Sequence, residues 1–486
     1  MNQNPVPPPR PSSLRILSLV LLLAFMAWPT AGPAQVYPPD FRFIRVPAPL
    51  AADNPPYPLI SRPIPNPGES FFDLRFGTLQ TRVTQSSTVR HEYSRFDPFN
   101  CNQSRLLVTR ITTGDWRVYR TTAKPYDQAA NLVRTINNLG EMRWDPDDPA
   151  TLWGFRDLSI IRLNVETGQE TLVKDFSADP AIAPLLAANP LIYRITCMDE
   201  GESSRDKRYW ALSLQNGDDP DHPEWSYVHK FLLTWDRLQD KVLGTYQLSL
   251  AQGQNLDWVG MSPLGNWVVI GGLSEQGVPP AWGLIMGSRD FAVLHQLSPD
   301  TAHADVGLDT QGREVIVMQN SRTDRVDLIP LDLSAKPVNS LADYNNNLIK
   351  PLVILYYNNE SPLGLNSGVH ISCNYPGYCL ISTNIGPDLP EQNWLDRCLI
   401  LVRLDRGNPQ AVYLAKIYNT TAQYWEETHG TMSNDGARII WVDNWGRAAP
   451  EPQTPQLTLT QLDLPPNWQK QFLPQGTSGL GLLLLY

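Results

Sequence analysis

The feature that most constrains the fold of this chain is a repeated unit of two β-prone runs joined by a turn. A clear example is "THGTMSNDGARIIWVDNWG" (428–446), where Asn434-Asp435-Gly436 supplies residues that tolerate positive φ and 439–442 forms the return strand. Units of this kind recur at intervals of roughly 40–60 residues, and no long amphipathic helix interrupts them. The pattern predicts short antiparallel sheets stacked side by side.

Seven such units can be followed along the chain by their turns. They are "HEYSRFDPFN" (91–100), "MRWDPDDPATLWGF" (142–155), "DEGESSRDKRYWALSLQ" (199–215), "LDWVGMSPLGNWVVIGG" (256–272), "HADVGLDTQGREVIVMQN" (303–320), "HISCNYPGYCLISTN" (370–384) and the unit quoted above. Sheets at this spacing close into a ring, which leaves only short, protected edges. We therefore predict an all-β chain with a single seven-bladed β-propeller of four-stranded antiparallel blades.

Ring closure requires a strand from one end of the chain to complete a sheet made by the other end. The segment "RFGTLQTRVTQ" (75–85) has the alternation of such a strand, and we expect it to pair beside "QLTLTQLDL" (456–464). The propeller then covers residues 69–465. Residues 466–486 form a C-terminal tail, whose apolar end we interpret as a buried strand or a docked segment.

The N-terminus has the pattern of an export signal. Arg10 and Arg15 precede an apolar run at 16–28, and small residues lead to Ala34, so residues 1–34 are predicted to be a signal peptide. The alternative is an uncleaved anchor, although the run is short for a membrane span. The mature chain is expected to be secreted or periplasmic, with no further span, and to begin with a proline-rich linker or strap at 35–68.

Charge and cysteine content limit the partners and the cross-links. The formal net charge of −10 argues against a nucleic-acid binder, which needs a basic face to neutralise phosphates. Five cysteines leave at least one unpaired, and Cys373 and Cys379 flank a turn, so a local disulfide between them is the best guess. The chain is expected to be a monomer that binds a glycan, a peptide or a partner protein.

The motifs resemble those of known propellers. The series "FGTLQTRVT", "HEYSRFDPFN", "DWVGMSPLGNWVVI", "HADVGLDTQGREVIV", "HISCNYPGYCLIST" and "ETHGTMSNDGARIIWVDNWG" is similar to a group of exported bacterial propeller proteins of mostly unassigned function. More distantly, the early Tyr-Ser and Pro-Phe-Asn unit and the final Thr-His unit look like those of the oligogalacturonate lyases. That resemblance implies seven blades and a divalent metal bound by histidines near the central channel.

Four of the seven histidines fall at corresponding places, each at the predicted start of a unit's first strand. They are His91, His303, His370 and His429. In a propeller the first strand is innermost, so these side chains are expected to ring one mouth of the channel. We predict His303, His370 and His429 as metal ligands.

Other polar residues lie beside these histidines or at equivalent positions. Asp257, Asp305 and Glu427 are predicted, together with His91, to line the channel or bind the ligand. Neutral imidazoles with a carboxylate suit a divalent cation such as Mn²⁺, Zn²⁺ or Ca²⁺. In a lyase the ion would bind the uronate carboxylate while a base removes the α-proton.

Three interpretations of the histidines stay open. They form a polar network with one another and with trapped water, they bind a metal or ligand without catalysis, or they belong to an enzyme. We interpret the protein as an exported binding propeller whose ligand sits at the channel mouth, with or without a divalent metal. The alternative is a metal-dependent lyase acting on uronate oligosaccharides.

Overall fold

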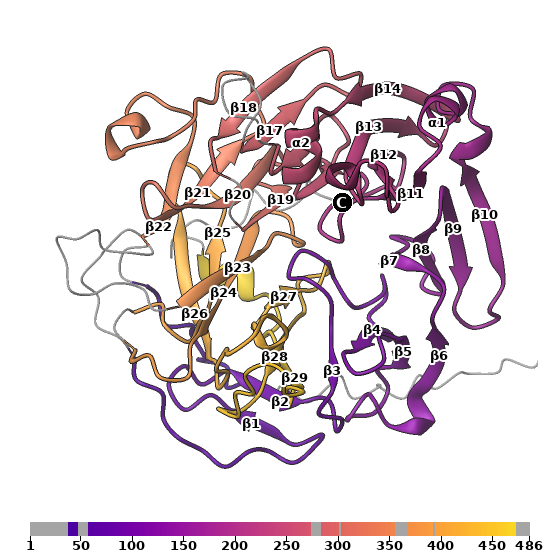
Figure 1. Ribbon diagram of the computed structural model, residues 1–486. Helices are drawn as coiled ribbons and strands as arrows, with labels where there is room; N and C mark the ends of the chain where they lie inside the picture. Colours follow the sequence, from indigo (N-terminus) through magenta and orange to yellow (C-terminus); the bar gives the residue numbers. More distant parts are fainter. Residues whose placement is uncertain are drawn as a thin grey trace, which may run out of the picture.

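The chain folds into a closed ring of seven antiparallel β-sheets around a central channel (Figure 1). The computed structural model describes residues 37–46, 57–273, 283–300, 303–354, 367–391 and 394–472. Six sheets have four strands, and the closing sheet has five. The predicted seven-bladed β-propeller of four-stranded antiparallel blades is confirmed, and the closing blade carries one additional edge strand.

The blades are numbered in chain order. Blade 1 contains β3 (Val89–Arg90), β4 (Arg105–Arg110), β5 (Trp116–Arg120) and β6 (Leu132–Ile136). Blade 2 contains β7 (Gly140–Trp144), β8 (Thr151–Arg156), β9 (Ser159–Asn164) and β10 (Glu170–Asp175). Blade 3 contains β11 (Ile192–Thr196), β12 (Tyr209–Asn216), β13 (His229–Asp236) and β14 (Lys241–Gln247). Blade 4 contains β15 (Trp258–Met261), β16 (Val268–Gly271), β17 (Leu284–Gly287) and β18 (Leu294–Ser298).

The remaining three blades complete the ring. Blade 5 contains β19 (Ala304–Leu308), β20 (Glu314–Asn320), β21 (Arg325–Pro330) and β22 (Lys350–Ile354). Blade 6 contains β23 (Ser367–Ser372), β24 (Tyr378–Ile385), β25 (Cys398–Arg403) and β26 (Gln410–Lys416). Blade 7 contains β27 (Thr431–Met432), β28 (Arg438–Asp443), β29 (Thr458–Asp463), β2 (Leu79–Arg82) and β1 (Ser70–Phe72).

Helices are short and lie in the connections. The described residues contain two α-helices, α1 (Ala183–Ala188) and α2 (Leu250–Asn255). The 3₁₀ turns are η1 (Ala129–Asn131), η2 (Phe176–Ala178), η3 (Pro223–Trp225), η4 (Leu341–Tyr344), η5 (Tyr424–Glu426) and η6 (Trp468–Phe472). Within the described parts of the chain, no helix is long and apolar enough to cross a membrane.

The ring closes where the sequence predicts. In blade 7, β2 pairs with β29 in antiparallel register, with Gln80 opposite Leu462 and Arg82 opposite Thr460. A strand from the N-terminal side therefore completes a sheet made by the C-terminal side. The predicted pairing of 75–85 with 456–464 is confirmed, and it ties the two ends of the propeller together.

The described part of the proline-rich segment follows the outside of the ring. Tyr413 donates its backbone N–H to Ile44, and Val46 donates to Ala411, at 2.9 Å each, so this segment pairs with the outer edge of β26. Figure 1 shows these indigo segments beside β26 and β1. The predicted signal peptide and residues 473–486 of the predicted tail lie outside the described residues.

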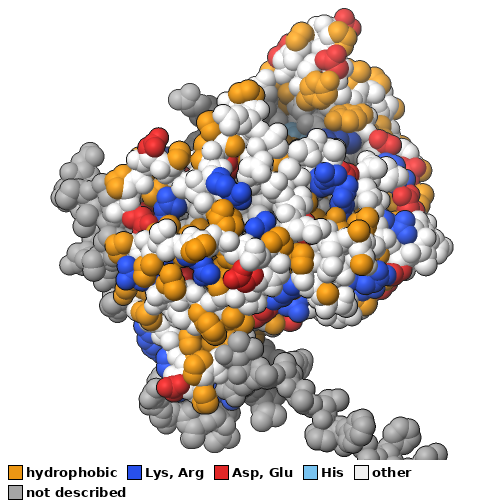
Figure 2. Space-filling view, turned by 90° about the horizontal axis from the view of Figure 1, so that it is seen from below, with side chains coloured by type: hydrophobic (Ala, Val, Ile, Leu, Met, Phe, Trp, Pro, Cys, Tyr) orange, Lys and Arg blue, Asp and Glu red, His pale blue; other side chains and the backbone are white. Residues whose placement is uncertain are grey.

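The hydrophobic core lies between neighbouring blades. Leu107 and Val118 of blade 1 pack with Met142 and Leu152 of blade 2, and the same kind of cluster joins blade 6 to blade 7. On the face that Figure 2 shows, basic, acidic and hydrophobic side chains are interspersed. Apolar contact between sheets therefore holds the ring together.

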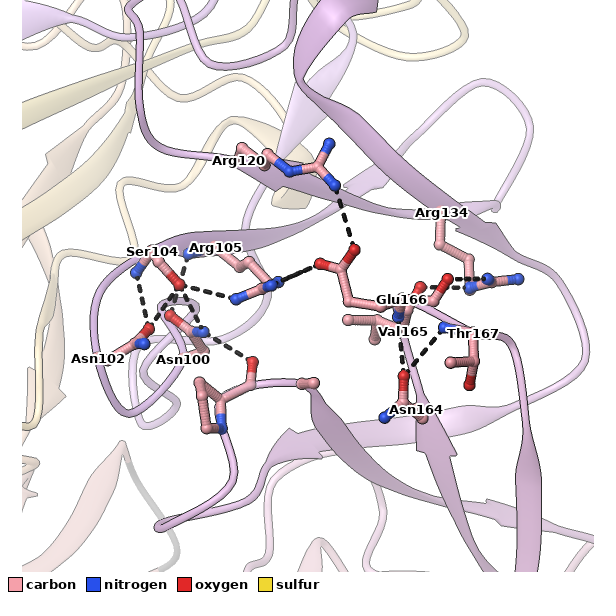
Figure 3. A network of polar contacts seen from close by, with 12 residues as sticks. Asn100, Asn102, Ser104, Arg105, Arg120, Arg134, Asn164, Val165, Glu166 and Thr167 are labelled. Atoms are coloured by element: carbon pink, nitrogen blue, oxygen red, sulfur yellow. Dashed lines mark hydrogen bonds and ion pairs between the residues drawn. The ribbon is translucent and has the colours of Figure 1, made fainter. Parts of the chain in front are cut away.

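Polar contacts between blades add to this packing, as one network shows (Figure 3). Glu166, in the turn between β9 and β10, accepts hydrogen bonds from Arg105 at 2.9 Å and from Arg120 at 3.1 Å. Arg134 donates to the backbone carbonyls of Val165 at 2.6 Å and of Glu166 at 3.2 Å. Such partly exposed ion pairs contribute about 1 kcal/mol or less each to stability. They therefore add little to the apolar packing that holds blades 1 and 2 together.

All five cysteines are free thiols. Ser372 pairs with Leu380 in the β23–β24 hairpin; Cys373 follows Ser372 and Cys379 precedes Leu380, so the two cysteines face one another across the hairpin. Both thiols are buried. The structure thus places the predicted disulfide partners together, as thiols.

Candidate functional site

One segment of blade 1 fills the centre of the ring. After Arg90 pairs with Thr109, the chain leaves the β3–β4 ladder, and residues 91–96 enter the channel. We call these residues the central segment. It is buried, apart from the half-buried Glu92. Side chains of this segment contact every other blade.

On one side the central segment contacts blades 2, 3 and 4 through charged groups. Glu92 forms an ion pair with Arg143 of β7 at 2.7 Å. Arg95 forms an ion pair with Glu200, after β11, at 2.9 Å, and its guanidinium lies 4.2 Å from the ring centroid of Trp258 in β15. These buried arginines are each paired with a carboxylate, which burial of a charge requires.

On the other side the central segment contacts blades 5, 6 and 7. Tyr93 Oη lies 2.6 Å from His303 Nδ1. Ser94 donates its hydroxyl to the carbonyl of Ile371 at 2.9 Å and accepts a hydrogen bond from Thr431 through its own carbonyl at 3.1 Å. The segment therefore fixes the relative positions of the strands that carry the predicted histidines.

The structure brings His303, His370 and His429 together. The ring centroids of His303 and His370 are 4.6 Å apart, and those of His370 and His429 are 4.0 Å apart. The Tyr93 ring contacts all three imidazoles, with centroid distances of 4.8–6.4 Å. Three residues from blades 5, 6 and 7 thus share one place at the channel mouth.

Glu427 completes this group. Its Oε2 atom lies 3.2 Å from Nε2 of His370 and 3.2 Å from Nε2 of His429. One ligand atom from each of the three residues lies within 4.8 Å of the others. The carboxylate side chain is 22% exposed while both histidines are buried, so the group opens to solvent on the Glu427 side. We call His370, Glu427 and His429 the His–Glu–His group.

Arg90 fixes the orientation of His429. The Arg90 guanidinium is buried and donates to His429 Nδ1 at 2.6 Å and to the carbonyl of Trp425 at 3.0 Å. Because a guanidinium can only donate, His429 Nδ1 accepts, and the neutral ring carries its proton on Nε2, facing Glu427. Ligation of a cation through Nε2 therefore requires the other tautomer, in which Nδ1 carries the proton and Arg90 no longer donates to it.

The backbone at His429 is in an unusual conformation. Its φ of +44° lies in the left-handed region, which residues other than glycine rarely adopt. The hairpin that follows, around Gly436, contributes the positive-φ turn that the sequence predicts. Strained backbone of this kind concentrates at functional sites, where the surrounding structure enforces it.

The histidines of the site are neutral near pH 7. Burial, together with the neighbouring imidazole or arginines, lowers the pKa of His303 and His370 to about 3. Burial also lowers the pKa of His429 well below its ordinary value and raises that of Glu427. Neutral imidazoles have the lone pairs that metal coordination uses.

The other predicted site residues do not belong to the His–Glu–His group, although His91 lies near enough to lower the pKa of His429. His91 is buried in the central segment, and within the described residues neither of its ring nitrogens has a hydrogen-bond partner. Asp305 is buried and accepts a hydrogen bond from the backbone N–H of Cys373 at 2.5 Å, so its carboxylate supports blade 6. Asp257 is exposed at the start of blade 4. Of the predicted carboxylates, only Glu427 joins the histidines.

The predicted position of the histidines within their strands needs a correction. Only His303 directly precedes its strand, β19; His429 lies two residues before β27, and His370 is the fourth residue of β23. His91 follows β3, because the chain has already turned into the channel there. Sequence reasoning also missed Tyr93 and Arg90, although both lie within two positions of His91 in "RHEY".

The residues present fit a divalent cation. Within the described residues, neither ring nitrogen of His370 has a hydrogen-bond partner, although Nε2 lies 3.2 Å from the Glu427 carboxylate. A buried imidazole without partners is costly, and a cation would satisfy it. Two nitrogens and a carboxylate oxygen form a mixed donor set. This set suits Mn²⁺ or Zn²⁺ better than Mg²⁺, which prefers oxygen ligands. The role of these residues as ligands stays a prediction.

Fold and geometry together define a class: a seven-bladed β-propeller with a buried histidine and carboxylate cluster at one mouth of its channel. No protein-family model and no curated protein matches the chain. Among solved structures it is similar to an oligogalacturonate lyase in complex with manganese, with a TM-score of 0.53 and 12% identity over 84% of this chain and 98% of the other. It is also similar to the oligogalacturonate lyase of Vibrio parahaemolyticus, with a TM-score of 0.50 and 10% identity over 82% and 97%.

At such identities these comparisons show the fold. They agree with the resemblance noted in the sequence motifs, and the chain is a propeller of the same architecture as the oligogalacturonate lyases.

Proposed function

We propose that this protein is an exported binding propeller that holds a divalent cation at its channel mouth and uses it to retain a carboxylate-bearing glycan. The observation that carries the proposal is the convergence of His370 and His429 on one oxygen of Glu427, at 3.2 Å each. His303 is the candidate for a further nitrogen ligand, because its ring is 4.6 Å from that of His370. Manganese is the first candidate ion.

The surrounding residues contribute orientation. Tyr93 holds His303 through its hydroxyl, and Arg90 holds His429 from the side away from Glu427, although Nδ1 must take up the proton from Nε2 before His429 can bind a cation there. Partners that orient metal ligands in this way determine much of the affinity of a site. The open side of Glu427 gives a ligand access to the cation, which would attract a carboxylate there.

A second candidate function is a metal-dependent lyase acting on uronate oligosaccharides. The structural similarity to a manganese-bound oligogalacturonate lyase favours it. In that reaction a bound cation stabilises charge that develops on the uronate carboxylate while a base removes the neighbouring proton. Both candidate functions use the His–Glu–His group. They differ in whether the bound glycan is retained intact or cleaved.

Calorimetry with Mn²⁺ on the full chain tests the cation site. The wild-type protein should bind one ion, whereas His370→Ala and Glu427→Gln should weaken binding by about 100-fold or more, because each removes a ligand. His222→Ala is the control, because this histidine is exposed in a connection. Absence of Mn²⁺ and Zn²⁺ binding to the wild-type protein would refute the proposal.

Incubation with polygalacturonate and Mn²⁺ separates the two functions. A lyase creates a carbon–carbon double bond conjugated with the carboxylate, and its product absorbs in the near ultraviolet. A binding protein retains the polymer without that signal. Retention that depends on Glu427 but gives no absorbance supports the binding function.

A further inference from the structure

Two adjacent aromatic side chains stand at the rim of the site. Tyr424 is 52% exposed and Trp425 is 43% exposed, and both belong to η5, which directly precedes Glu427 in sequence. Their ring centroids are 5.5 Å apart at an angle of 73°, so the two rings form a corner. The Tyr424 ring lies 5.7 Å from that of His429. We call Tyr424 and Trp425 the aromatic corner.

The backbone beneath the aromatic corner is rigid. The carboxylate of Glu426 is buried and accepts hydrogen bonds from the backbone N–H groups of Ala422 at 2.8 Å and Ala449 at 2.7 Å. The Trp425 carbonyl accepts a hydrogen bond from Arg90. A turn held at three points keeps both rings in place without a ligand, which lowers the entropic cost of binding one.

The charges around the aromatic corner select the kind of ligand. The Arg90 guanidinium lies 5.7 Å from the Tyr424 ring centroid and 5.6 Å from that of Trp425. Arg90 would repel a cationic ligand on these rings, whereas Glu200 and Glu427 would repel an anionic one. An uncharged surface of C–H groups would be repelled by neither. Exposed aromatic area next to a polar site is thus suited to a ligand with an apolar face and polar edges.

The polar groups beside the rings suit hydroxyl groups. Partial burial and the nearby carboxylates of Glu200 and Glu427 raise the pKa of the Tyr424 hydroxyl to about 12, although Arg90 opposes them, so the hydroxyl stays protonated near pH 7. It can donate one hydrogen bond, while the two carboxylates can accept others. A pyranose ring has this combination of an apolar face and hydroxyl groups at its edge.

We propose that the aromatic corner is a sugar-binding subsite, on which a pyranose ring stacks while the next unit of the same oligosaccharide reaches the cation. The inference rests on the proposed function and extends it, because it makes the ligand a glycan of at least two units. The short distance from Tyr424 to His429 places the subsite immediately beside the cation. Cation binding itself does not depend on the aromatic corner.

Titration of the full chain with a galacturonate trimer in the presence of Mn²⁺ tests the subsite. Trp425→Ala should weaken trimer binding about tenfold, because truncation of a contacting tryptophan typically costs more than 1 kcal/mol. Trp425→Phe should recover part of the loss. The affinity for Mn²⁺ alone should stay within twofold of wild type in both variants, which distinguishes this inference from the proposed cation site.

Tyr227→Ala provides the matched control. Tyr227 is also exposed, at 57%, but lies in blade 3, away from the site. It should leave trimer affinity unchanged. Equal trimer affinity in wild type and Trp425→Ala, or failure of the wild-type protein with bound Mn²⁺ to bind the trimer, would overturn the subsite.

Discussion

Tyr93 Oη lies 2.6 Å from Nδ1 of His303, although 210 positions separate the two residues in the sequence. The contact joins the first blade to the fifth across the centre of the ring. It exists because the central segment leaves its own blade and enters the channel. The geometry of the candidate site is thus set by a part of blade 1 and by the strands that surround it.

Replacement of Tyr93 by phenylalanine tests whether this contact orients a ligand. Tyr93→Phe keeps the ring contacts with the histidines but removes the partner of His303 Nδ1. We expect Mn²⁺ affinity to fall about tenfold, as for other partners of metal ligands. Stability should fall by about 1–2 kcal/mol, because a buried nitrogen loses its hydrogen bond.

Calorimetry and chemical denaturation measure these two effects, with Tyr227→Phe as the exposed control. Unchanged Mn²⁺ affinity in Tyr93→Phe would exclude His303 as a ligand.

Buried histidines make the fold sensitive to acid, and His229 shows this away from the site. Its Nδ1 lies 2.8 Å from the Ser213 hydroxyl, and burial lowers its pKa from 6.5 to about 4. Between these pH values the unfolded chain binds a proton that the folded chain does not. The free energy of unfolding should therefore fall as the pH drops from about 6.5 to about 4, by about 1.4 kcal/mol per pH unit for this residue.

Denaturation across that pH range measures how steeply the free energy of unfolding changes with pH. For His229→Asn this slope should be smaller than that of wild type by the contribution of one proton. His222→Asn replaces an exposed histidine and should keep the wild-type slope. Identical slopes for wild type and His229→Asn would contradict the assignment of this proton to His229.

Gly430 lies in blade 7 where the backbone packs closely against blade 6. A Cβ atom at this position would lie 2.7 Å from Cβ of Ser382 and 2.9 Å from Cδ2 of Leu399. Gly430→Ala should therefore destabilise the protein by about 1–3 kcal/mol, the usual range for overpacking. Gly407→Ala is the matched control, because its nearest neighbour would be Asp405 Oδ1 at 3.6 Å.

Thermal unfolding of the two variants checks this contact. A clear decrease in the melting temperature is expected for Gly430→Ala alone. If both glycine variants melt like wild type, blades 6 and 7 do not pack as closely at this point as described.

Much of the fold can be predicted from the sequence because it depends on local patterns. Turns such as Asn434-Asp435-Gly436 mark the hairpins, and alternation in 75–85 marks the strand that closes the ring. These signals are contained within a few residues. The number of blades and the closure of the ring follow from them.

The site is less predictable because it depends on which way side chains point and on the path of the chain, which no local sequence pattern specifies. His303, His370 and His429 come together as expected, yet they occupy different positions relative to their strands. Asp305 faces Cys373 in the next blade, although alternation along a strand would place its side chain on the same face as that of His303, two residues earlier. The contacts of Tyr93 exist because the chain enters the channel at this point. The sequence pattern of "HEYS" does not predict that path.

The most direct test of the central claim is anomalous diffraction from crystals of the protein soaked in Mn²⁺. A bound ion should give one strong anomalous peak at the channel mouth, about 2.0–2.3 Å from nitrogens of His370 and His429 and from a carboxylate oxygen of Glu427. Crystals of Glu427→Gln should lack the peak under the same conditions. A wild-type map with no peak between these three side chains, or with manganese bound elsewhere, would contradict the proposed cation site.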